Sequence, residues 1–277
     1  MASARRVAAV ADPPILRRAL IGAALAFVGV FLAAPLAVIL TEAFRRGFGA
    51  YAAAVTDPAA LAALRLTLLS AGCAVALNLV FGLAAAWALA KHDFRGKAVV
   101  LTLIDVPFAI SPVISGLMFV MIFGRHGLLG PFLAAHGWRL LFTPAAIVLA
   151  TSFVTLPFVA RELIPLMESQ GAAEEEAALT LGASGWQTFR LVTLPNVKWG
   201  ALYGVILLNA RAMGEYGAVS IVSGHIQGLT NTLPLHVEAL YNEYETTAAF
   251  AVASLLAAMA LAALAARGLI SWGSDEH

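Results

Sequence analysis

Six long apolar segments constrain the fold of this chain more than any other feature of its sequence. They cover residues 19–41, 66–90, 98–123, 140–160, 199–222 and 246–266. A helix needs about 20 mainly apolar residues to cross a bilayer, whereas the strands of a membrane barrel are about ten residues of alternating polarity. The segments therefore predict an all-α polytopic integral membrane protein with six transmembrane helices, which contact membrane lipid.

The composition excludes several other classes of protein. Hydrophobic residues make up 61% of the 277 residues and charged residues 12%, too few to cover the surface of a soluble domain. The net charge of +1 provides no basic face for nucleic acid. A single cysteine, Cys73, excludes an internal disulfide, and the six histidines lack a metal-ligand spacing. We expect no nucleic-acid partner, no metal and no cofactor.

Lysine and arginine are unevenly divided between the two sides of this arrangement. With the N-terminus inside, the inner segments contain eleven of these residues and the outer loops four. Because basic loops stay on the cytoplasmic side, both termini are predicted to be cytoplasmic. A cleaved signal peptide is the alternative for the first segment, but its 23 apolar residues exceed the usual run of about 7–15.

The long loop between the fourth and fifth apolar segments has a pattern of its own. Residues 172–181 are strong helix formers with acidic residues in the first turns, and Gly182 stands at the position of a C-terminal cap. Ser184 and Gln187 have the spacing of a capping box that begins a second short helix, which we expect Pro195 to end. The loop is therefore predicted to be a helix–turn–helix.

The three consecutive glutamates 174–176 bear on what this loop contacts. Helices that lie on anionic headgroups are usually basic, so the acidic run favours a protein partner. An amphipathic hairpin on the membrane surface stays the alternative.

The loop also resembles the cytoplasmic loop of ABC-importer permeases. That family has Glu-Ala-Ala, three residues, Gly, nine residues, Ile, one residue and Leu-Pro; this chain differs only in having valine for isoleucine. The matching residues are Glu176, Ala177, Ala178, Gly182, Val192, Leu194 and Pro195. The resemblance implies that they belong to a coupling loop (165–198) that docks onto a separate ATPase subunit. It also implies a type-1 (MetI-like) permease domain at 60–266, after a tail (1–18) and a first helix with its outer loop (19–59), and before a second tail (267–277).

Further segments narrow the resemblance. Residues 211–219 and 105–113 are similar to sulfate and molybdate permeases, and residues 223–225, 232–235 and 241–245 resemble the CysW-type subunits of sulfate/thiosulfate importers. This implies transport of sulfate or thiosulfate across a bacterial inner membrane by alternating access. The implied partners are two ABC ATPase subunits, a second homologous permease subunit and a periplasmic sulfate-binding protein. A molybdate or tungstate importer of the same build is the nearest alternative.

The chain has no ATP-binding motif of its own. The P-loop pattern requires a glycine five residues before Gly-Lys and Ser or Thr after it, but Gly96-Lys97 has Lys91 and Ala98 at those positions. We therefore expect a subunit that is not an enzyme and that takes its energy from a partner. An ion-coupled secondary transporter is the alternative from another class, and it predicts an internal repeat that this sequence does not show.

Three charged residues lie inside the apolar segments, where charges usually face a protein interior or a water path. Arg211 and Glu215 are four residues apart on one expected helical face, with Arg211 about 18 Å into its helix. The pair either lines the translocation pathway or only fixes helix packing. Asp105 is the third such residue.

Asp105 precedes two prolines, Pro107 and Pro112, that we expect to kink or break the third segment. Helix ends at such a break offer free amide groups to an anion, so Asp105 is a second candidate for the pathway. Alternatively, it caps the chain near the cytoplasmic interface. The polar segment 223–245 is a candidate contact for a binding protein, a gate, or a solvated loop.

Overall fold

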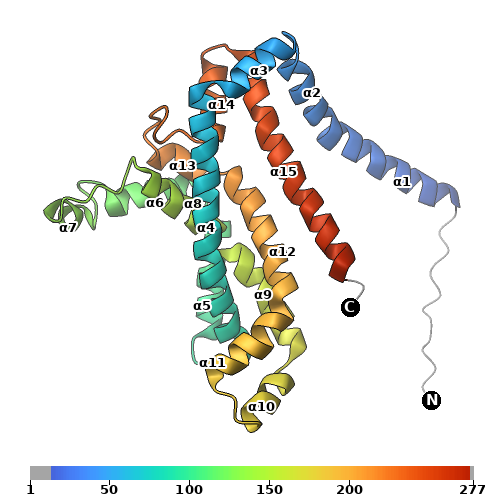
Figure 1. Cartoon of the computed structure of the whole chain (residues 1–277), viewed down its shortest axis with the longest axis vertical. Helices are drawn as coiled ribbons and strands as arrows, with labels where there is room; N and C mark the ends of the chain where they lie inside the picture. The colour runs from blue at the N-terminus through green and yellow to red at the C-terminus, as the bar shows by residue number, and fades with distance from the viewer. Residues whose placement is uncertain (1–13, 275–277) are drawn as a thin grey trace.

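The computed structural model describes residues 14–274, and its regular secondary structure is entirely helical (Figure 1). The all-α prediction is confirmed. Most of the predicted N-terminal tail and the last residues of the predicted C-terminal tail, 1–13 and 275–277, lie outside the described residues. The α-helices are α1 (Pro14–Val28), α2 (Ala34–Ala43), α3 (Phe48–Thr56), α4 (Pro58–Lys91), α5 (Lys97–Ala109), α6 (Pro112–Phe123), α7 (Gly130–Ala135), α8 (Pro144–Thr155), α9 (Pro157–Gln170), α10 (Ala173–Thr180), α11 (Gly185–Thr188), α12 (Leu194–Met213), α13 (Gly217–Val222), α14 (Leu233–Asn242) and α15 (Thr246–Ser274).

Five helices in the described part of the chain are long and apolar enough to cross a membrane. They are Ile15–Ala43, Pro58–Lys91, Pro144–Gln170, Gly185–Met213 and Thr246–Ala266. The bent pair α5 and α6 makes a sixth if it is counted as one span. Five of the predicted segments thus correspond to long helices, and the third does not form a straight one.

The third segment is broken where its prolines predict a break. Pro107 lies inside α5, and Pro112 begins α6. Ser111 is held extended, with φ −56° and ψ 136°, because a residue before proline avoids the helical conformation. The axes of α5 and α6 therefore differ by 108°, and α6 and α7 project sideways from the bundle in Figure 1.

The fifth segment ends earlier than predicted. Residues 199–222 were expected to form one helix, but α12 ends at Met213 and the short helix α13 begins at Gly217. At Gly217 an added Cβ would lie 2.8 Å from Pro112 Cβ. Close packing of α13 on α6 at a glycine therefore accompanies the break.

The core of the molecule is built around α4, which runs vertically through the bundle in Figure 1. One buried cluster joins α4 to α9 and α12, and includes Leu89, Leu163, Met167 and Leu208. At Gly82 an added Cβ would lie 2.7 Å from Val159 Cβ, so α4 and α9 approach closely at that glycine. Another buried cluster joins α4 to α14 and α15 through Ala60, Ala63, Leu233 and Val252.

The first membrane helix stands apart from the rest of the bundle. α1 and α2, joined by the π-helical turn η1 (Gly29–Ala33), lean away from it, and α2 approaches the bundle near α3 and the start of α15 (Figure 1). The apolar part of this helix has 0% of its residues buried, whereas 56% are buried in the corresponding part of Pro144–Gln170. The last helix, α15, continues to Ser274, into the region expected to be a tail.

Candidate functional site

Two short helices form the loop between α9 and α12, at the lower end of the bundle in Figure 1. α10 has three glutamates in its first turn. Gly182 follows at φ 91°, a left-handed conformation that glycine adopts without strain. Ser184 Oγ accepts a hydrogen bond from Gln187 N at 3.3 Å, and Gln187 Oε1 accepts one from Ser184 N at 2.7 Å, which completes the capping box of α11. The predicted helix–turn–helix is confirmed.

Pro195 does not end the second helix of this loop, and that prediction is wrong. Gly185–Met213 is one continuous helix, with Pro195 in the first turn of α12. A proline inside an α-helix normally clashes with the carbonyl four residues earlier. Here the π-helical turn η2 (Phe189–Thr193) widens the backbone just before it, and Leu194 N donates to Phe189 O. The loop is therefore joined rigidly to the membrane helix.

The first two glutamates of α10 bind the protein's own helices. Glu175 Oε1 lies 2.9 Å from Lys91 Nζ and accepts a hydrogen bond from Thr193 Oγ1 at 3.2 Å. Glu174 accepts one from Asn196 Nδ2. Burial favours a neutral Glu175, but the hydrogen bonds from Lys91 and the backbone prevail and hold the pKa of Glu175 below its ordinary value.

The other residues of the predicted docking motif differ in their exposure. Glu176, Ala177, Gly182 and Pro195 are exposed, whereas Ala178, Val192 and Leu194 are half-buried. Within the described chain, the Glu176 carboxylate has no ion-pair or hydrogen-bond partner. Four large apolar side chains of the same loop are also exposed, and the motif did not include them: Leu179, Leu181, Trp186 and Leu191. Their presence in a polar loop was the signal that could have identified them.

The predicted pair of Arg211 and Glu215 forms, but not on one helix. Arg211 lies in the last turn of α12, and Glu215 follows in the break before α13. Arg211 Nη1 and Glu215 Oε2 are 2.7 Å apart, in an ion pair without the direction of a hydrogen bond. Glu215 Oε1 accepts a hydrogen bond from Ala218 N at 2.9 Å. The Glu215 side chain is 1% exposed and that of Arg211 35%, so the guanidinium is the accessible member.

Asp105 has a partner that sequence reasoning missed. Arg161 Nε donates to Asp105 Oδ1 at 2.7 Å, and the Arg161 guanidinium lies 5.0 Å from the centre of the Phe108 ring. Arg161 was counted as a residue beyond the end of the fourth apolar segment, but α9 continues to Gln170. Both side chains stay substantially exposed, at 57% for Arg161 and 40% for Asp105. The structure does not bring this pair into contact with Arg211.

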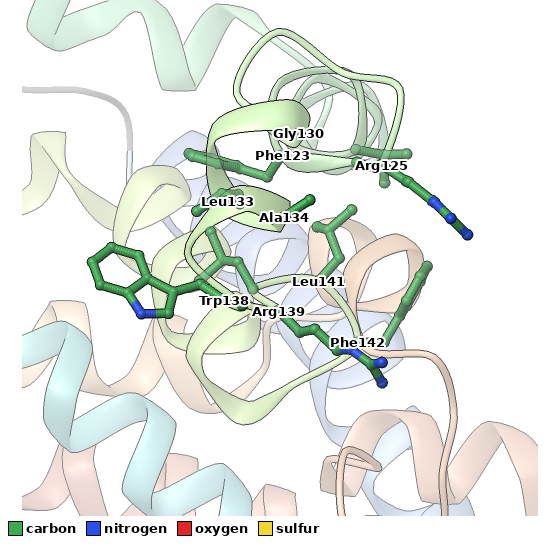
Figure 2. Close-up of a pocket in the computed structure, with 13 residues that line it drawn as sticks. Phe123, Arg125, Gly130, Leu133, Ala134, Trp138, Arg139, Leu141 and Phe142 are labelled. Carbon is green, nitrogen blue, oxygen red and sulfur yellow. The ribbon is translucent and has the colours of Figure 1, made fainter.

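A cavity of about 680 Å³ lies between the end of α6, α7 and the chain that leads to α8. Its lining is mainly apolar, with Phe123, Leu133 and Leu141 among the residues. In Figure 2 the side chains of Arg125 and Arg139 extend to the same side of this cavity, and Trp138 extends to the other. The sequence pattern gave no indication of this cavity.

The segment 223–245 is packed against the bundle rather than simply solvated. Thr230, Asn231, Thr232 and His236 are all buried. Leu233 N donates to Thr67 Oγ1 of α4 at 2.8 Å, and Tyr216 Oη donates to Glu238 Oε1 at 2.6 Å. Across the described residues, no three His, Cys, Asp or Glu side chains gather in a way that could hold a metal ion.

Multiple membrane-crossing helices, an exposed loop continuous with one of them, and charges held within apolar segments define the class of protein: a multi-pass membrane protein with the build of a permease. Residues 78–272 match the family described as "Binding-protein-dependent transport system inner membrane component". The chain belongs to this family. It is therefore a membrane component of a transport system of the inner membrane that depends on a binding protein.

Individual relatives are similar over nearly their whole length. The sulfate transport system permease protein CysW of Synechococcus elongatus is 48% identical over 267 residues, which cover 96% of this chain and 93% of that protein. CysW of Escherichia coli K12 is 47% identical over 93% of this chain and 89% of its own length. CysT of Escherichia coli K12, another sulfate transport system permease protein, is 36% identical over 87% of each.

Solved structures confirm the fold. A bacterial alginate ABC transporter, crystallised with an alginate-bound periplasmic protein, contains a chain that matches with a TM-score of 0.74 at 18% identity. The match covers 93% of each chain. At this level of identity the likeness concerns the fold alone.

Proposed function

We propose that this chain is a CysW-type permease subunit of a sulfate importer, driven by a separate ATPase. The observation that carries the proposal is the exposed α9–α12 loop, which presents Glu176 and four apolar side chains and whose second helix continues into the membrane. Such a loop suits a docking partner that pushes on the membrane helix directly. The sulfate assignment is supported by the printed functions of the CysW and CysT relatives.

The α9–α12 loop is the coupling loop in this proposal, and it faces the cytoplasm together with both termini. A protein partner for the loop requires exposed apolar area together with a polar anchor. Trp186 is 68% exposed and Leu181 88%, and Glu176 on α10 is exposed as well. The coupling motif of the sequence is therefore the ATPase contact, extended by these apolar side chains.

The translocation pathway passes Arg211 and the pair of Asp105 and Arg161. Lipid does not accommodate exposed charges at membrane depth, so these partly exposed groups face a water path or another subunit. The carboxylate of Glu215 is buried behind Arg211, which leaves the cationic side of that pair accessible to a dianion. Partial neutralisation by Glu215 keeps the attraction weak enough for the anion to leave.

A second, related permease subunit completes the pathway, and CysT relatives indicate its kind. The apolar part of the first membrane helix has no buried residues, so it offers a broad surface to lipid or to that subunit. The packed segment 223–245, held to α4 at Thr67, faces the binding protein and serves as a gate.

The test is competition for uptake. Proteoliposomes that contain this chain with its second permease, the ATPase and the binding protein are expected to take up labelled sulfate. Unlabelled sulfate or thiosulfate is expected to compete, and molybdate or tungstate to compete weakly. If molybdate or tungstate competes more strongly than unlabelled sulfate at the same concentration, the substrate assignment is wrong.

A further inference from the structure

α4 reaches both ends of the bundle without a break. Its 34 residues make a rod about 50 Å long at about 1.5 Å per residue. Its lower end in Figure 1 meets the coupling loop, and its upper end lies near α3 and α14. A helix of this kind can carry a displacement from one end to the other if both ends are firmly attached.

The lower attachment is a shielded ion pair. Lys91, in the last turn of α4, lies 2.9 Å from Glu175 of α10, and the two side chains are only 9% and 16% exposed. Lys91 Nζ also donates to the carbonyl oxygen of Gly171, where the coupling loop begins. Thr193 Oγ1 binds the same carboxylate oxygen from the loop's far end. One ammonium group thus ties α4 to both the start and the first helix of the loop.

A neighbouring lysine shows that this arrangement is specific. Lys97 has two acidic neighbours, Asp93 at 3.6 Å and Glu168 at 3.9 Å, and its side chain is 26% exposed. Neither neighbour lies in the loop between α9 and α12, because Asp93 precedes α5 and Glu168 lies within α9. Exposed pairs at such distances contribute little, whereas loss of one partner from a shielded pair leaves an uncompensated charge. Lys97 is therefore a matched control for Lys91.

The upper attachment is a buried hydrogen bond. Thr67 Oγ1 of α4 accepts from Leu233 N, the first residue of α14, at 2.8 Å. Thr67 is 2% exposed, and Leu233 packs against Ala60 and Ala63 of the same helix. Midway along α4, Asn78 Nδ2 donates to Ser152 O at 2.9 Å and fixes the rod to α8.

We propose that Lys91 is a positioning residue that joins the coupling loop to α4, so that α4 carries the loop's displacement to α14 at the opposite face. The inference rests on the proposed function, because a partner ATPase supplies the displacement. Lys91 and Glu175 bind neither ATP nor substrate in this account. Lys91 and Glu175 determine how much of the ATPase displacement reaches α14, in the segment 223–245 that serves as the gate of the translocation pathway.

The experiment measures sulfate taken up per ATP hydrolysed in proteoliposomes that contain the whole transport complex. Lys91→Met and Glu175→Gln are each expected to lower this ratio about tenfold, a typical size for coupling between sites, while ATP hydrolysis continues. The exchanged pair, Lys91→Glu with Glu175→Lys, is expected to restore most of the ratio. Thr67→Val, which removes the acceptor for Leu233 N, is expected to lower it as well. Lys97→Met is expected to leave it unchanged.

An unchanged ratio in Lys91→Met and Glu175→Gln overturns the inference, and so does a parallel loss of uptake and hydrolysis, since the pair would then only hold the fold. If a single variant fails to assemble, Lys91→Arg replaces it, because arginine keeps the charge and alters its geometry. If the unmodified complex takes up no sulfate, the proposed function fails instead. The role of the Lys91–Glu175 ion pair is then tested on the ratio of ATP hydrolysis with the binding protein to ATP hydrolysis without it.

Discussion

The carboxylate of Glu215 is almost fully buried, and two contacts compensate its charge there: the Arg211 guanidinium and the backbone N–H of Ala218. The spacing of four residues between Arg211 and Glu215 made their pairing predictable. Asp105 and Arg161 are 56 residues apart, so their pairing depends on how α5 and α9 pack. No local pattern in the sequence contains that information. For the same reason, the sequence motif did not separate Glu175, which binds Lys91, from the exposed Glu176.

Arg211 is expected to be essential for uptake. Arg211→Ala alone leaves Glu215 charged and buried, at a cost of about 3–5 kcal/mol, so it is combined with Glu215→Gln. The double variant is expected to assemble with the ATPase in a pull-down and to lose at least about tenfold in sulfate uptake. Arg45→Ala, at an exposed arginine, is the control and should transport normally. Normal uptake by the double variant would mean that Arg211 and Glu215 only fix the packing of the helices.

His236 is expected to make stability depend on pH. Burial lowers its pKa from 6.5 by more than Asp57 and Glu243 raise it. The unfolded chain therefore binds the proton more tightly, and stability is lost as pH falls below 6.5. The melting temperature should fall between about pH 7.5 and about pH 5.5, and His236→Gln should reduce that fall. His126→Gln, at an exposed histidine, should keep the wild-type difference; an equal loss in both variants would contradict this assignment.

At the scale of the helices, prolines and glycines decide where segments begin, end and touch. The break at Pro112 and the cap at Gly182 follow from local chemistry and were predictable. The continuation of the helix through Pro195 was not, because it depends on the π-helical turn before it. The early end of α12 was also missed, since α13 packs on α6, far away in the sequence.

The contact of α4 with α9 is expected to tolerate no side chain at Gly82. In Gly82→Ala the new Cβ would meet Val159 Cβ at 2.7 Å, so the two helices must separate. Such overpacking costs about 1–3 kcal/mol, and the melting temperature in detergent should fall. At Gly72 of the same helix an added Cβ meets nothing within 4 Å. Gly72→Ala should therefore be neutral or slightly stabilising; equal losses at both glycines would refute the close contact.

At the scale of the whole molecule, the two ends of the helix bundle carry different elements. The lower end in Figure 1 carries the α9–α12 loop, the proposed coupling loop, and the upper end carries α3 and the packed segment with α14. The excess of lysine and arginine predicts that the lower end is cytoplasmic. The fold class and the helix–turn–helix between α9 and α12 were predictable from sequence, because membrane helices and capping motifs are local patterns. The sideways course of α6 and α7 was not, because it depends on the angle at the break.

This orientation is tested with cysteines and a thiol reagent that does not cross membranes. Cys73 is exposed, so it is first replaced by alanine. Single cysteines are then placed at Ser3, Ser184 and His126. Intact cells are expected to be labelled at residue 126 alone, and opened vesicles at all three. Labelling of Ser184→Cys in intact cells would show that the protein has the opposite orientation.

We conclude that this chain is a permease subunit of a transport system whose ATPase is a separate protein. Its most direct test is sulfate uptake into proteoliposomes that contain this chain and its second permease, measured with and without the ATPase, ATP and the binding protein. Uptake is expected only when all of these components are present. Sulfate uptake by the permease subunits alone, driven by an ion gradient, would contradict it.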